Sequence, residues 1–159
     1  MGEGGGDGLV HLTQGDPLSG YPIDLREEAR LGGHTIDEHV NVNPEYLAAR
    51  VRREPEEIRE RGDDFRGLSV GSFASLTRAI RFVNSTVSQG QDLVNEVAQG
   101  RRAFAIIEAR FDSVTGYESY LATYHAQPYM RDTYGVRVFI LRDRRTARGY
   151  RVQSAFPIR

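Results

Sequence analysis

A change of sequence texture after Gly100 is the feature that most constrains the fold of this chain. Before Gly100, apolar residues recur at helical spacing, most clearly between positions 76 and 87. After it, runs of β-branched and aromatic residues are separated by turn-like pieces, a pattern typical of strands. Helices followed by antiparallel strands predict an α+β domain.

The local patterns predict where these elements lie. Helices are expected over 24–31, over 43–53, from Ser75 onward, and from 91 to Gly100. The first ends at Gly32-Gly33, and the second has Asn43 as its N-cap. A further ordered segment begins at 34–39, where Thr35 and Glu38 have the spacing of a capping box. Residues 54–66 are charged and are expected to be exposed. Strands are expected over 68–70, 103–111, 120–125, 136–142 and 149–156.

Length and composition exclude several classes of protein. The 159 residues suit one domain with one core, which we place at 21–159 after a flexible segment at 1–20. No apolar run is long enough to span a membrane, and the glycine-rich start does not resemble a signal peptide. Cysteine is absent, so disulfides, thiolate catalysis and cysteine zinc sites are excluded.

The charge of the chain is unevenly distributed. All 21 basic residues are arginine, and the formal net charge is −1. Residues 1–100 carry a formal charge of −7 and residues 101–159 one of +6. The basic half could face RNA across a cleft. Alternatively, the arginines between 142 and 148 form only a solvated hairpin turn.

Two distant segments carry the side chains needed for metal-free phosphodiester cleavage. His34 and His39 offer imidazoles for proton transfer, and Arg50 offers a guanidinium that can bind two phosphate oxygens. Ser154, on the last expected strand, offers a hydroxyl. The two histidines are five residues apart and would not share a helix face, so they are an unlikely metal pair. From the residues alone, a structural role is the more common one for each of these side chains.

Two other histidines carry weaker signals. His125 lies in an aromatic-rich stretch, and its side chain has two possible roles, packing against the protein or stacking on a base. His11 falls in the expected flexible segment.

The motifs together resemble one known family, the bacterial RNase A-like toxin domain. That domain stands at the C-terminal ends of contact-dependent growth inhibition proteins and related polymorphic toxins. The resemblance runs from about Leu25 to Pro157. It is carried by Gly33-His34-Thr35, His39-Val40, Leu47, Arg50, Gly71-Ser72-Phe73, Val136-Arg137-Val138, Arg142-Asp143, Gly149-Tyr150 and Ser154-Ala155-Phe156-Pro157.

The resemblance implies a fold and a chemistry. The fold would be that of pancreatic ribonuclease, with short helices and a bent antiparallel sheet but no disulfides. The activity would be metal-independent RNA cleavage to a 2′,3′-cyclic phosphate, without a cofactor. The family's histidine and arginine fall on His39 and Arg50, with His34 in support. Its terminal threonine and tyrosine become Ser154 and Phe156 here, so one hydroxyl is lost.

The resemblance also implies partners. We expect RNA, with tRNA as one candidate, bound partly by Phe156 and Tyr150. A cognate immunity protein, acidic at its interface, should cover the basic cleft. The free domain is expected to be a monomer, delivered as an effector to the cytoplasm of a target cell.

Two alternative functions stay open. One is a non-catalytic RNA- or protein-binding module that retains the fold, and the other is a metal-dependent nuclease.

Overall fold

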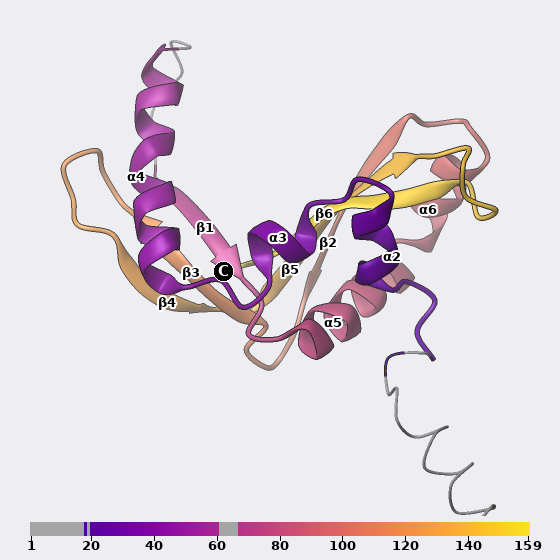
Figure 1. Ribbon diagram of the computed structural model, residues 1–159, viewed down its shortest axis with the longest axis horizontal. Coiled ribbons are helices and arrows are strands. Elements are labelled where there is room, and N and C mark those ends of the chain that lie inside the picture. The colour runs from indigo at the N-terminus through magenta and orange to yellow at the C-terminus, as the bar shows by residue number, and fades with distance from the viewer. Residues whose placement is uncertain (1–17, 19, 61–66) are drawn as a thin grey trace, which may run out of the picture.

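The computed structural model describes residues 18, 20–60 and 67–159, and these form an α+β fold, as the sequence predicts (Figure 1). The segment predicted to be flexible, 1–20, lies outside the described residues except for Leu18 and Gly20. The elements run in the order α2 (Leu25–Arg30), α3 (Thr35–His39), α4 (Pro44–Glu60), β1 (Leu68–Ser72), α5 (Leu76–Gln89), α6 (Gln91–Ala98), β2 (Phe104–Arg110), β3 (Gly116–Leu121), β4 (Tyr129–Thr133), β5 (Gly135–Arg142) and β6 (Tyr150–Ile158).

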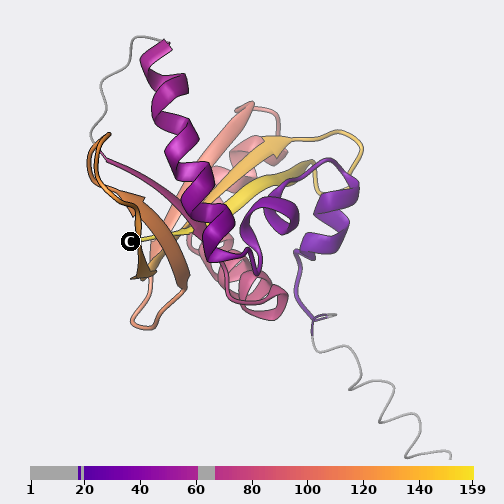
Figure 2. The same ribbon diagram turned by 60° about the vertical axis from the view of Figure 1, so that its left-hand side comes forward.

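The strands form two antiparallel sheets of three strands each, in the orders β1-β3-β4 and β2-β5-β6. Figures 1 and 2 show α4 beside the first sheet. Helices α5 and α6 pack against the second sheet. Helices α5 and α6 bury Ile80, Val83 and Val94 in the main core, together with Val138 and Ile140 of β5. A smaller core joins α4 to the first sheet through Leu47, Val51, Val70 and Leu121.

Several predicted helix ends are confirmed. Asp24 caps α2 by accepting the N–H of Arg26 at 3.0 Å, and Ser75 caps α5 by accepting the N–H of Arg78 at 3.2 Å. Helix α6 ends at Ala98, just before Gly100, whose φ of +78° lies in the left-handed region that favours glycine.

The predicted capping box at Thr35 is wrong. The N-cap of α3 is His34, and it makes no side-chain capping bond. The reason is tertiary: the His34 N–H donates to the Gln153 carbonyl of β6 at 2.8 Å, which fixes the start of the helix one residue earlier. Thr35 becomes the first helical residue, and its buried hydroxyl has no hydrogen-bond partner in the described part of the chain.

Two predicted bounds also differ from the structure, and one strand was not predicted. Helix α4 continues through Pro55 to Glu60 instead of ending near Arg53. The strand expected at 120–125 ends at Leu121, where the chain turns, and strand β4 was not predicted. Most side chains of β4 are exposed, so β4 lacks the alternation that marks a half-buried strand.

Candidate functional site

One cavity gathers His39, Arg50, Ser154 and Phe156, although they are spread over more than a hundred residues of sequence. Its volume is about 280 Å³. Residues of α3, α4, β1 and β6 meet there, and the remaining lining residues are Glu38, Glu54, Ser69, Val70 and Gly71. The structure therefore places an imidazole, a guanidinium and a hydroxyl around a single hollow.

His39 is held in place by the backbone around it. It ends α3, and its carbonyl accepts the N–H of Phe73 at 2.8 Å. Two residues later, the N–H of Asn41 donates to the Phe73 carbonyl at 2.7 Å. Asn41 has a φ of 49°, a left-handed conformation that asparagine tolerates better than most residues. The chain thus turns sharply after His39 and is pinned to the end of β1.

The hydrogen bond of the His39 ring selects one tautomer. Nδ1 lies 2.8 Å from the carbonyl oxygen of Gly71. A carbonyl only accepts, so Nδ1 carries the proton and Nε2 of the neutral ring keeps its lone pair. The ring is buried, and its centroid lies 5.1 Å from that of Phe156. His39 is therefore set up as a proton acceptor at Nε2.

Burial lowers the pKa of His39 below its usual value of 6.5, because the charged imidazolium is poorly solvated there. The Gly71 carbonyl raises this pKa, the positive charge of Arg50 lowers it, and the negative charge of Glu38 raises it. The lowered pKa keeps the ring neutral near pH 7, the form that can accept a proton.

One nitrogen of the Arg50 guanidinium contacts the carboxylate of Glu38. Its Nη2 lies 3.4 Å from Oε2 of Glu38, and the same oxygen lies 3.7 Å from Nε2 of His39. Nη1 of Arg50 is buried and has no hydrogen-bond partner among the described residues. A buried donor without a partner is unfavourable. The guanidinium as a whole lines the cavity, so it can present its positive charge to an anion there.

A β-bulge turns Ser154 toward the cavity. Phe139 of β5 is opposite Ser154, whereas the next residue, Ile140, is opposite Val152, so Gln153 is an extra residue in β6. Without it, the strict alternation of a strand would put Ser154 on the same side as the core residue Val152. With it, Val152 and Ala155 are buried, and Ser154 and Phe156 line the cavity.

The structure does not bring the other predicted site residues to this cavity. The His34 side chain is exposed. The backbone N–H of His34 donates the hydrogen bond to β6 described above. Tyr150 packs against the main core under the guanidinium of Arg148, 4.7 Å from its ring centroid. His125 lies against Tyr124, and His11 is outside the described residues. The roles predicted for His34 and Tyr150 stay predictions.

Several residues of the cavity were not predicted from the sequence as site residues, and two of them, Glu38 and Gly71, bear directly on its chemistry. Glu38 precedes His39 directly, yet only the fold shows that its carboxylate lies between His39 and Arg50. Gly71 acts through its carbonyl, which no side-chain pattern reveals. A Cβ on Gly71 would stand 2.6 Å from the Pro157 carbonyl oxygen, so only glycine lets β1 approach β6 this closely.

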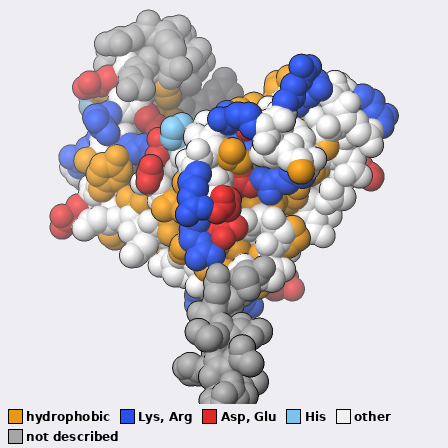
Figure 3. Space-filling view, turned by 45° about the vertical axis from the view of Figure 1, so that its right-hand side comes forward, with side chains coloured by type: hydrophobic (Ala, Val, Ile, Leu, Met, Phe, Trp, Pro, Cys, Tyr) orange, Lys and Arg blue, Asp and Glu red, His pale blue; other side chains and the backbone are white. Residues whose placement is uncertain are grey.

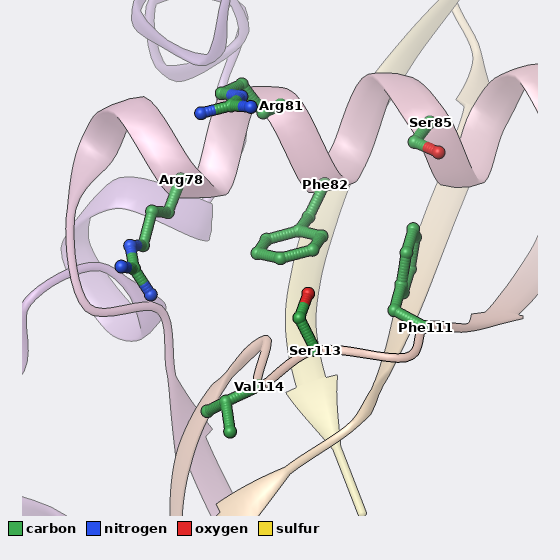
Figure 4. A pocket seen from close by; sticks show the side chains of 7 residues that line it. All are labelled: Arg78, Arg81, Phe82, Ser85, Phe111, Ser113 and Val114. Carbon is green, nitrogen blue, oxygen red and sulfur yellow. The ribbon is translucent and has the colours of Figure 1, made fainter.

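A larger cavity of about 460 Å³ lies elsewhere, between α5 and the loop after β2 (Figure 4). The rings of Phe82 and Phe111 meet edge to face there, with centroids 5.0 Å apart, and Arg78 and Arg81 lie on α5 beside them. None of its lining residues is a histidine or a carboxylate. Its size therefore does not make it the better candidate for proton-transfer chemistry.

Arginine and acidic side chains are intermixed on the face shown in Figure 3. The turn between β5 and β6 is anchored to the protein as well as solvated. Arg145 pairs with Asp143 at 2.7 Å, and Arg148 pairs with the buried Glu28. Hydrogen bonds from Arg145 hold the pKa of Asp143 well below its usual range.

Within the described part of the chain, no helix has the length and apolar character needed to cross a bilayer. The same part of the chain contains no group of three or more histidine, aspartate or glutamate side chains arranged to hold a metal ion.

Comparison with known proteins agrees with this architecture. A solved structure, the CdiA-CT/CdiI complex from Y. kristensenii 33638, contains a chain that matches with a TM-score of 0.59 and 20% sequence identity. The match covers 80% of this chain and 100% of that one. At this level of identity, the match shows a shared fold and no more. No curated protein matches. Residues 33–157 match the family described as the bacterial CdiA-CT RNase A domain, which spans both ends of the candidate site. The chain therefore belongs to the bacterial CdiA-CT RNase A domain family.

Proposed function

We propose that this domain is a metal-independent endoribonuclease toxin that cuts RNA by attack of a 2′-hydroxyl, acting as a delivered effector in the cytoplasm of a target cell. The observation that carries the proposal is the single cavity shared by His39, Arg50 and Ser154. Family membership and the likeness to a CdiA-CT structure support it.

In the first step, Nε2 of His39 takes the proton of the 2′-hydroxyl, and the 2′-oxygen forms a bond to phosphorus. Arg50, which lines the cavity, donates from its guanidinium to a phosphate oxygen and balances the charge that builds up on the phosphorane. The Ser154 hydroxyl donates to another phosphate oxygen and orients it. The bond from phosphorus to the 5′-oxygen then breaks, which leaves a 2′,3′-cyclic phosphate.

The departing 5′-oxygen needs a proton. Phe156 stands where the resemblance implies a tyrosine, so no phenol is present at this position. Among the side chains that line the cavity, His39 is the one whose ordinary pKa lies closest to neutrality. We therefore assign the return of the proton to the His39 imidazolium formed in the first step, which restores the neutral ring.

Cleavage in the presence of EDTA tests the proposal. The purified domain should degrade RNA at an undiminished rate in EDTA and leave fragments ending in 2′,3′-cyclic phosphate. Sequencing the new RNA ends after brief expression would then show whether tRNA is the target. Loss of cleavage in EDTA would support a metal-dependent nuclease instead, and no cleavage in any buffer would support a binding module.

We also propose a cognate immunity protein that covers this cavity with acidic side chains. The likeness to a CdiA-CT chain solved with CdiI supports such a partner, and the guanidinium of Arg50, which lines the cavity, offers it a charged contact. In the same EDTA assay, the purified product of the gene next to the toxin gene should abolish cleavage at equimolar concentration. An unaffected rate would contradict this partner.

The pH dependence of cleavage follows from the environment of His39. Because burial lowers its pKa below 6.5, the ring stays neutral down to mildly acidic pH. As pH falls through this lowered pKa, the ring gains a proton and the base is lost. We therefore expect kcat/KM to fall on the acidic side with an apparent pKa below 6.5, measured on a short RNA.

Glu38 and Arg50 should move this acidic limb in opposite directions. Glu38 raises the pKa of His39, so Glu38→Gln should shift the limb to lower pH. Arg50 lowers that pKa, so Arg50→Gln should shift the limb of the remaining activity to higher pH. A purely structural role for Glu38 would change the rate without moving the limb. Asp37→Asn, an exposed neighbour on α3, is the matched control and should leave the profile unchanged.

A further inference from the structure

The outer face of the β2-β5-β6 sheet is continuous with the candidate site. Cross-strand pairing places Ser154, Phe139 and Ile106 in one row across β6, β5 and β2. The next row contains Phe156, Arg137 and Glu108. Neighbouring strands lie about 4.8 Å apart, so the far edge of the sheet is about 10 Å from the serine of the cavity.

Part of this face is apolar and open to solvent. Phe104 and Ile106 on the edge strand β2 are 52% and 51% exposed. The rings of Phe104 and Phe139 contact each other, with centroids 5.6 Å apart and planes tilted by 41°. Helices α5 and α6 pack on the opposite face of the sheet, where Ala105 and Ile107 are buried. Exposed apolar side chains in a contiguous patch mark a binding surface.

A cationic side chain links this patch to the cavity. The guanidinium of Arg137 lies 5.8 Å from the centroid of the Phe156 ring, which in turn contacts His39. Arg137 also pairs with Glu108 at 2.6 Å, and both side chains are partly exposed. The surface thus combines aromatic rings with arginine, the combination that binds unpaired nucleotides through stacking and phosphate contacts.

We propose that Phe104, Ile106 and Phe139 form a base-stacking subsite for unpaired nucleotides next to the scissile phosphate. The inference rests on the proposed ribonuclease function, because its occupant is the RNA whose phosphate occupies the cavity. The row from Ser154 to Ile106 leads from that phosphate directly onto the aromatic patch. Paired bases are stacked within a duplex and cannot lie on these rings, so the subsite takes RNA only where it is unpaired.

Binding of a non-cleavable ligand separates this inference from the catalytic one. The probe is a fluorescent eight-nucleotide single strand with 2′-deoxy sugars throughout, which cannot be cut by 2′-hydroxyl attack. We expect Phe104→Ala to weaken its binding about 10-fold, the loss typical of one stacked base. Tyr129→Ala, equally exposed at 52% but on the other sheet, is the matched control and should bind as the parent does.

Cleavage assays complete the test. Phe104→Ala should lower kcat/KM for the corresponding ribo-oligonucleotide about 10-fold and leave that for a dinucleotide within about twofold. Unchanged probe binding by Phe104→Ala would overturn the subsite, whether or not the parent cleaves RNA. Weakened probe binding by a protein that cleaves nothing would uphold the subsite and overturn the ribonuclease proposal. Loss of affinity only for an inhibitory protein would make this face a protein interface and overturn the subsite.

Discussion

Replacing His39 with alanine is expected to lower kcat/KM for RNA by about 10²- to 10⁴-fold, the usual contribution of a positioned general base. Nε2 of His39 is the nitrogen left free to accept a proton, because Nδ1 donates to the Gly71 carbonyl at 2.8 Å. In our mechanism the same ring also returns the proton to the departing oxygen. Its removal therefore affects both halves of the reaction.

The measurement needs a control for structure, because the His39 ring is buried against Phe156. His39→Asn supplies it: the asparagine amide can still donate an N–H toward Gly71, but it has no basic nitrogen. We expect this variant to melt close to the parent and to be about as inactive as His39→Ala. His125→Ala, a histidine outside the cavity, should cleave normally. Cleavage by His39→Asn at the parent rate would remove His39 from the mechanism.

The helical half of the fold could be predicted because its signals are local. Ser75 caps α5 with its own side chain, and the apolar residues that follow keep to one face. The bounds of α4 could not be predicted in the same way. A proline usually marks a boundary, because the residue before it is disfavoured in the helical region. Here α4 continues past Pro55, a buried residue, and tertiary context overrides the local preference.

The errors in the predicted strands show a second limit of prediction from local sequence. Tyr120 and the aromatic residues after it favour β structure by composition, but β3 ends at Leu121. Strand β4 pairs with β3 through backbone hydrogen bonds, and most of its side chains are exposed. Its existence depends on a partner strand rather than on its own apolar pattern.

The candidate site was predicted in a different way from the fold. From the residues alone, a structural role was the more common one for His39, Arg50 and Ser154, and the resemblance to a family brought them together with Phe156. Two features escaped because they are properties of the folded backbone. One is the Gly71 carbonyl that selects the tautomer of His39, and the other is the bulge at Gln153 that turns Ser154 outward.

Glu28→Ala is expected to destabilise the fold by about 3 kcal/mol, near the low end for a broken buried ion pair, since Arg148 remains 29% exposed. Glu28 is 1% exposed and joins two parts of the chain. One carboxylate oxygen pairs with Arg148, and the other accepts the backbone N–H of Val152 in β6 at 3.2 Å. Alanine would leave both donors without this acceptor.

Neighbouring variants separate the two contributions. Glu28→Gln keeps an oxygen that can accept the Val152 N–H but removes the charge facing Arg148, so its free energy of unfolding should fall between those of the parent and Glu28→Ala. Glu27→Ala, which breaks an exposed pair with Arg30 on the same helix, should change it by less than about 1 kcal/mol. Urea unfolding followed by circular dichroism provides these values. Equal stability of Glu28→Ala and Glu27→Ala would contradict the anchoring role.

The same anchor positions the catalytic side chains in our mechanism. Glu28 holds β6 near Val152, two residues before Ser154, and its own carbonyl accepts the Gly33 N–H at 2.8 Å, just before the helix that ends at His39. RNA cleavage by Glu28→Ala should therefore fall on warming in parallel with its folded fraction, at temperatures where Glu27→Ala is still fully active. Cleavage that persisted after the circular dichroism signal was lost would show that this contact does not position the site.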